Sequence, residues 1–114
     1  MTDKLMEILE SFGYPVRLRT YLLGTDTMPE TLITYEETAS EDDRVYDNEE
    51  HAVKWSYTVT IISKNPKTTL TVAKDLKKKI KGTDFTMQGL GTGFSADGTG
   101  YVGRNCYLHG IERD

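Results

Sequence analysis

The chain has 114 residues, 37% of them hydrophobic and 28% charged, with a formal net charge of -4. This length accommodates one domain, residues 1–114, and the composition is that of a folded globular protein. No apolar run reaches the ~20 residues of a membrane span, and a single cysteine, Cys106, excludes an internal disulfide. The net acidity argues against a dedicated nucleic-acid binder. The first residues lack the pattern of a secretory signal, and with one cysteine we expect the chain to be made in a reducing cytosol or to be indifferent to redox state.

In the first half of the chain, hydrophobic spacing predicts one helix and two strands. Residues 2–12 predict a short amphipathic helix, with Thr2 or Asp3 as its cap and Gly13 at its end. Residues 16–23 predict a short strand or an extended connection, and residues 31–37 a strand. The strongest signal is the strict alternation of residues 52–63, which places one set of side chains on one face of a strand: Val53, Trp55, Tyr57, Val59 and Ile61. The two strands are consecutive, so we expect them to pair antiparallel.

In the second half, Asn65-Pro66 predicts the start of a helix that ends before Gly82. Its expected apolar face consists of Leu70, Ala73, Leu76 and Ile80. Residues 83–90 and 101–112 predict two further strands, joined by a flexible loop at 91–100. The predicted order is therefore α-β-β-α-β-β. It gives an α+β two-layer sandwich, in which two helices cover one face of an antiparallel or mixed sheet.

Charge is distributed unevenly along the chain. An acidic segment, residues 36–50, contains our candidate contact acids: Glu41, Asp42, Asp43, Asp47, Glu49 and Glu50. A lysine cluster lies on the second predicted helix and just after it: Lys74, Lys77, Lys78, Lys79 and Lys81. Patches of opposite sign on one small domain suit head-to-tail self-association. The alternative is two separate solvated faces.

The sequence carries little sign of chemistry. The acids lack the spacing of a calcium loop, and carboxylates on an exposed segment lack the desolvation that raises a pKa for acid–base catalysis. The glycines of residues 89–93 resemble a phosphate loop, but a turn and a strand follow them in place of a helix. His51 and His109 have no second ligand nearby, and Cys106 is expected to face the core. We therefore predict a non-enzyme with no catalytic residue, metal site or cofactor.

The chain resembles the tail completion, tail terminator or head-to-tail joining proteins of long-tailed phages, which are often found in prophages. The resemblance rests on size, element order and three short stretches: Gly13–Val16, Pro29 with Ile33–Tyr35, and the closing strand Tyr101–Gly110. It implies a structural virion protein that caps the tail tube as a ring, typically of six subunits, and presents a surface to the head connector. The partners implied are other copies of the chain, the tail tube protein and the head–tail connector protein. The location implied is the host cytoplasm during assembly, then the virion tail.

Within this family resemblance, the charges have two possible uses. The acidic segment of one subunit can face the lysine cluster of the next, or it can line the lumen and repel passing DNA. We expect residues 40–50 and 91–100 to be mobile until a partner docks. The competing hypothesis is a cytoplasmic binding or regulatory module that holds a peptide or small ligand in a crevice lined by Trp55 and Tyr57.

Overall fold

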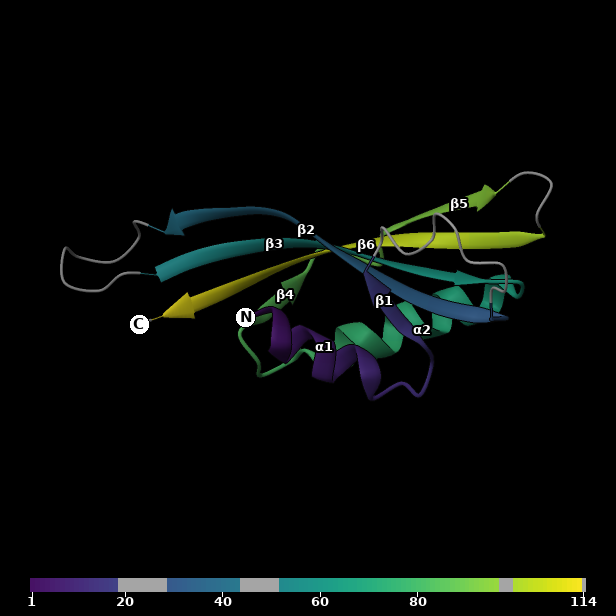
Figure 1. The fold of residues 1–114 in the computed structure, drawn as a ribbon, viewed down its shortest axis with the longest axis horizontal. Coiled ribbons are helices and arrows are strands. Elements are labelled where there is room, and N and C mark those ends of the chain that lie inside the picture. Colours follow the sequence, from purple (N-terminus) through teal and green to yellow (C-terminus); the bar gives the residue numbers. More distant parts are fainter. Residues whose placement is uncertain (19–28, 44–51, 97–99, 114) are drawn as a thin grey trace.

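The computed structural model describes residues 1–18, 29–43, 52–96 and 100–113. These residues form two helices and six strands (Figure 1). The helices are α1 (Thr2–Glu10) and α2 (Pro66–Lys79). The strands are β1 (Val16–Leu18), β2 (Thr31–Asp43), β3 (Ala52–Ser63), β4 (Phe85–Met87), β5 (Thr92–Ala96) and β6 (Tyr101–Arg113). The α+β class predicted from the sequence is therefore confirmed.

The sheet is mixed. Its strand order is β1-β2-β3-β6-β4, and β5 also pairs with β6. β1 lies parallel to β2, and the other pairs are antiparallel, including β2 with β3 as the sequence predicted. The predicted order contained four strands, and the structure has β1 and β5 in addition. β1 occupies part of the segment left open between strand and connection, and β5 occupies part of the expected 91–100 loop.

Both helices lie on the same side of the sheet in Figure 1. α2 begins as predicted, because the side chain of Asn65 accepts a hydrogen bond from the backbone N–H of Lys67 at 3.0 Å. α1 differs from the prediction, since its cap position is Met1 and has no side-chain cap hydrogen bond. Thr2 instead lies inside the helix, and its hydroxyl bonds the phenol of Tyr57 at 2.9 Å.

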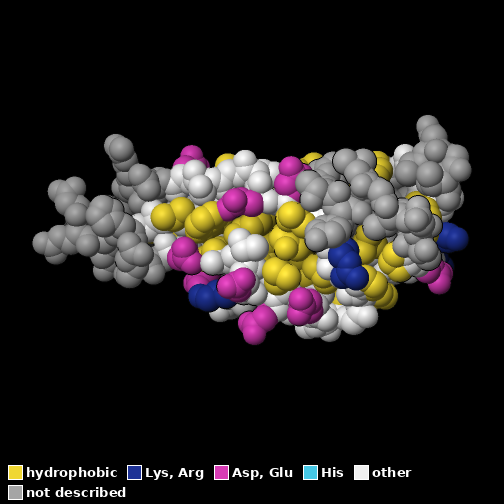
Figure 2. Space-filling model, viewed as in Figure 1, with side chains coloured by type: hydrophobic (Ala, Val, Ile, Leu, Met, Phe, Trp, Pro, Cys, Tyr) yellow, Lys and Arg dark blue, Asp and Glu magenta, His cyan; other side chains and the backbone are white. Residues whose placement is uncertain are grey.

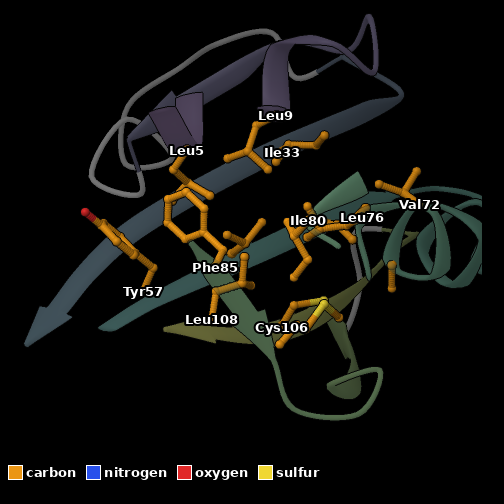
Figure 3. Packing of buried hydrophobic residues seen from close by; sticks show 14 residues of the cluster. Leu5, Leu9, Ile33, Tyr57, Val72, Leu76, Ile80, Phe85, Cys106 and Leu108 are labelled. Atoms are coloured by element: carbon orange, nitrogen blue, oxygen red, sulfur yellow. The ribbon is translucent and has the colours of Figure 1, made fainter. Parts of the chain in front are cut away.

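The core lies between the helices and the sheet (Figure 3). Leu5 and Leu9 of α1 are fully enclosed, in keeping with their helical spacing of four. The buried face of α2 is rotated from the predicted one, since Thr69 and Val72 are buried with Ala73 and Leu76. Leu70, expected in the core, is only half-buried. On the predicted inner face of β3, Tyr57, Val59 and Ile61 are enclosed, whereas Val53 and Trp55 are half-buried. Thr58 and Thr60 of the other face are buried as well.

The molecule is elongated, with extents of 52 × 28 × 23 Å. Its radius of gyration is 15.1 Å, against ~13 Å for a compact domain of this length. The cause is visible in Figure 1, where β2, β3 and β6 continue past the helices towards one end of the molecule. We call this extension the arm and define it as residues 36–43 of β2, 52–57 of β3 and 108–113 of β6.

Two predicted boundaries are corrected. β2 continues to Asp43, although the sequence placed its end at Glu37, with a long loop or hairpin arm from Ser40 to Glu50. β4 has only three residues, fewer than the predicted strand at 83–90. In both cases the pairing partner decides the strand: β2 follows β3 up to the pair Asp43–Ala52, whereas β4 finds pairing only along three residues of β6. The parts of the two expected mobile loops at 44–51 and 97–99 lie outside the described residues.

Candidate assembly surface

The arm is a three-stranded ribbon of β2, β3 and β6, and open strand edges lie on both sides of it. β1 pairs with β2 only at residues 33–35, so the arm part of β2 has β3 on one side and no strand of the described chain on the other. At the opposite edge of the sheet, β4 is the last strand and pairs with residues 108–110 of β6. The two open edges therefore belong to β2 and to β4. Unpaired edges offer backbone N–H and C=O groups to another chain.

A bulge decides which face of the arm each acid occupies. Thr38 is an extra residue, because Glu37 pairs with Tyr57 while Ala39 pairs with Ser56. Residues directly opposite each other in an antiparallel pair share a face. Glu37 therefore lies on the helix side of the sheet with Tyr57, and Glu41 lies on the outer side opposite Lys54. Without the bulge, both acids would lie on the same face.

The candidate acids are only partly placed by the structure. Glu41 is exposed in the arm. Asp42 and Asp43 are at the end of β2, in register with Val53 and Ala52. Asp47, Glu49 and Glu50 lie outside the described residues, as does His51. Figure 2 shows acidic side chains bordering a band of hydrophobic side chains that follows the long axis of the molecule.

The lysine cluster divides into three groups around α2. Lys74, Lys78 and Lys81 are exposed, and Lys77 is half-buried. Lys79 turns towards α1, where its ammonium donates to the hydroxyl of Ser11 at 2.8 Å and lies 4.6 Å from the centroid of the Phe12 ring. Lys79 therefore joins the two helices within one molecule.

Among the described side chains, no acid of the candidate set forms an ion pair with a lysine of the cluster. Among the described residues, the ion pairs join the Met1 ammonium to Glu112 at 3.0 Å and Lys4 to Asp84 at 3.7 Å. Neither pair includes a candidate acid or a residue of the lysine cluster. Apart from Lys79, which contacts Ser11 and Phe12, the described residues of the candidate set are therefore not tied to other charged groups by these ion pairs.

A depression of about 330 Å³ lies where the end of α2 meets β4. Its walls include Lys77 and Lys81 from the helix end, and Phe85, Thr86 and Met87 from the strand. Phe85 and Met87 are buried on the helix side, whereas Thr86 is exposed on the other side of the same strand. Because its lining residues include all three positions of β4, we place the depression along the open edge of this strand. Sequence reasoning missed this feature because it depends on the strand order.

A second depression of about 290 Å³ lies between the end of α1 and α2. Neither depression includes Trp55 or Tyr57. Tyr57 is enclosed, and burial raises the pKa of its phenol above the ordinary value while the bond to Thr2 partly offsets this. The competing hypothesis of a ligand crevice lined by Trp55 and Tyr57 stays a prediction.

Glu112 is a feature of the arm that the sequence did not indicate. Its carboxylate accepts a hydrogen bond from the Met1 ammonium, and this bond is the main reason why the pKa of Glu112 is lowered. The indole of Trp55 is close enough to favour the ionised carboxylate as well. However, its Nε1 lacks a hydrogen bond of good geometry. The contact with Met1 connects the start of α1 to the arm.

The glycine-rich turn, His109 and Cys106 all make contacts within the fold. Arg104 donates from one terminal nitrogen to the carbonyls of Leu90 and Gly91 at 3.0 and 3.3 Å, which fixes the glycine-rich turn before β5. His109 Nδ1 lies 3.1 Å from the Ser56 hydroxyl. Cys106 is buried, as predicted, and burial raises the pKa of its thiol to about 11.

Two further observations concern metals and membranes. The described residues contain no group of three or more His, Cys, Asp or Glu side chains that could hold a metal ion. In the same residues, no helix has the length and apolar character to span a membrane.

Comparison with known proteins does not assign a family. No family model matches the sequence, and no curated protein matches it significantly. The functional argument therefore rests on the arm, the lysine cluster and the open sheet edges.

Proposed function

We propose that this protein is a structural subunit that assembles into a ring, caps the tail tube of a long-tailed phage or prophage, and joins the tail to the head connector. The observation that carries the proposal is the arm, which extends an acidic, open-edged ribbon past the helices. Within the arm, Ala52, Tyr57 and Leu108 are buried in the monomer, whereas the open edge of β2 carries exposed acids that an assembling subunit can use to contact a neighbour.

The charge distribution supports contact between unlike surfaces of two copies. The arm carries the exposed acid Glu37 on the helix side of the sheet, and Lys77 and Lys81 lie at the end of α2 and just after it. A contact between two different patches of the same protein is heterologous, and repeated heterologous contacts close into a ring when the rotation permits. Lys79 bonds Ser11 within the same molecule, so we assign the contact to the other lysines of the cluster.

The same proposal covers the finer architecture and the partners. The helices and the sheet form the two layers of a sandwich, and the arm extends from its sheet layer. The partners are other copies of the chain, the tail tube protein and the head–tail connector protein, with DNA passing through the ring. The protein acts without catalysis, first in the host cytoplasm and then in the virion tail. Acids outside the subunit contacts can line the lumen, where negative charge disfavours adhesion of DNA.

The experiment that tests this role is inactivation of the gene in its parent phage or prophage, followed by induction and negative-stain electron microscopy of the lysate. We expect filled heads beside unattached or over-long tails. A plasmid copy of the wild-type gene should restore joined virions, which serves as the control for effects on neighbouring genes. Normal joined virions in the absence of the protein would eliminate the proposed role in the tail.

A further inference from the structure

The open edge of β4 has backbone groups that point towards the depression beside it. Ile111 donates its N–H to the Asp84 carbonyl at 3.2 Å, and Gln88 donates to the Tyr107 carbonyl at 3.4 Å. Alternate residues of an antiparallel strand direct their backbone groups to the same side. Asp84, Thr86 and Gln88 therefore face β6, and Phe85 and Met87 face the open edge. The Phe85 N–H bonds the Thr83 hydroxyl, which leaves the Phe85 carbonyl and both groups of Met87 directed outward.

We propose that this edge receives the open edge of β2 from the arm of a second copy, so that the two sheets become continuous. This inference rests on the self-assembly proposed above and specifies its contact. β-strand addition supplies main-chain hydrogen bonds, and side chains beside the edge supply selectivity. Lys77 and Lys81 line the depression, so the added strand should be acidic. The arm part of β2 has an open edge and carries exposed acids such as Glu37.

The sheet order excludes the same contact within one molecule. β2 and β4 lie on opposite sides of the pair β3–β6. The arm is also tied to β3 up to the pair Asp43–Ala52. The β2 edge of one copy can thus reach a β4 edge only on another copy. Repetition produces a continuous sheet with a fixed head-to-tail direction, and closure of that sheet removes both edges.

The register within one sheet shows which arm residues lie level with β4. One row across the sheet contains Met87, Leu108, Tyr57 and Glu37, and another contains Phe85, Gly110, Trp55 and Ser40. β4 and residues 37–40 of β2 therefore occupy the same level along the strands. A second copy added without a shift along the strand direction places its β4 beside residues 37–40 of the first.

This arrangement assigns different roles to the two exposed acids. Glu37 lies on the helix side of the sheet, as do the lysines at the end of α2, so Glu37 meets Lys77 and Lys81 of the neighbour. Glu41 lies on the outer side opposite Lys54 and does not enter the depression. The chain thus offers matched controls on both sides of the contact. Glu41 is the control for Glu37, and the exposed pair Lys74 and Lys78 is the control for Lys77 and Lys81.

The test compares charge-reversed variants of the full chain by sedimentation velocity at fixed ionic strength. We expect Glu37→Lys, and separately the double variant K77E/K81E, to raise the concentration required for assembly by more than about tenfold. Glu41→Lys and K74E/K78E should remain within about twofold of the wild type. The triple variant E37K/K77E/K81E restores the opposite charges and should recover assembly.

Hydrogen exchange distinguishes strand addition from a contact of side chains alone. On assembly, the outward N–H of Met87 should gain protection, whereas the N–H of Thr86, which faces β6, should change little. Far-ultraviolet circular dichroism checks that each variant folds, and the milder K77Q/K81Q replaces any double variant that does not. Equal losses from K74E/K78E and K77E/K81E, no recovery by the triple variant, or no protection at Met87 would each overturn the inference.

The proposed role in the tail can fail independently of this contact. A wild-type protein that assembles with the expected variant pattern, but whose loss leaves virions normal, retains the contact and loses the tail function. A wild-type protein that stays monomeric at all accessible concentrations overturns the contact. In that case the microscopy of lysates still decides whether the protein is needed to join heads and tails.

Discussion

Substitution of Gly91 by alanine should destabilise the fold much more than the same substitution two residues earlier. Gly91 has φ +78°, and a Cβ atom there would lie 2.1 Å from the backbone oxygen of Asn105. Gly89 has φ +57°, and nothing lies within 4 Å of its Cβ position. Both substitutions incur the left-handed strain of an L-residue, but only the one at Gly91 forces the backbone of the β5 start away from β6.

The magnitude follows from these two contributions. Left-handed strain costs about 1–2 kcal/mol at either position. The backbone contact at Gly91 adds about 1–3 kcal/mol, the usual cost of overpacking, and its displacement also disturbs the Arg104 hydrogen bond to the Gly91 carbonyl. The entropy that alanine removes from the unfolded chain is common to both variants and cancels in their comparison. We expect Gly91→Ala to cost about 2–5 kcal/mol, and Gly89→Ala about 1–2 kcal/mol.

Urea denaturation monitored by Trp55 fluorescence measures this difference. The two variants should show similar slopes of free energy against urea, because they expose similar surface on unfolding, and different midpoints. The Gly91 variant is expected to lose a substantial fraction of a total stability of about 5–15 kcal/mol. Stabilities that agree within about 0.5 kcal/mol, the usual range for a neutral surface change, would show that the β5–β6 contact does not constrain this turn.

Two further predictions concern buried groups of β6. Burial raises the pKa of the Cys106 thiol from 9.0 to about 11. The buried thiol is therefore favoured in its neutral form, and its contribution to the free energy of unfolding is complete below pH 9. It is lost as the pH rises towards 11, by up to ~3 kcal/mol, because the unfolded chain loses the thiol proton first. Cys106→Ala should flatten the alkaline part of a plot of unfolding free energy against pH, and parallel curves for the two proteins would refute this. Gly110→Ala should cost more than Gly103→Ala in urea midpoints, because the added Cβ meets the enclosed Phe85 ring in one case and the exposed Phe94 ring in the other. Equal midpoints would show that both rings can move aside.

The elements that the sequence predicted well are those with strong local signals. β3 matches its predicted bounds because alternation over residues 52–63 encodes one buried face. α2 starts as predicted because Asn65 caps it locally. β5 was missed because Thr92–Ala96 has a glycine within it and glycines before it, a composition typical of loops. Its strand conformation depends on pairing with β6 and on the Arg104 bonds to the turn, and neither contact is visible in the local pattern.

The candidate surface also combines features with a local sequence signal and features that depend on the fold. The acids and lysines were evident from the sequence, because charge clusters require only composition and spacing. The depression beside β4 was not, since it forms where a short strand and the end of α2 meet. The opposite faces of Glu37 and Glu41 also depend on the bulge at Thr38, whose position follows from the register with β3. A shift of one residue reverses the face of every later side chain.

Acids on an open strand act in two ways that together favour a single partner. Charge on an exposed edge disfavours indiscriminate pairing with other strands, since desolvation and repulsion oppose it. The same charge favours an edge beside unpaired lysines, because their attraction offsets that penalty. Both conditions occur in this chain, with the acidic edge on β2 and the lysine-lined edge on β4. Since they lie at opposite sides of one sheet, the charges that disfavour random association of the monomer would also give the proposed assembly its direction.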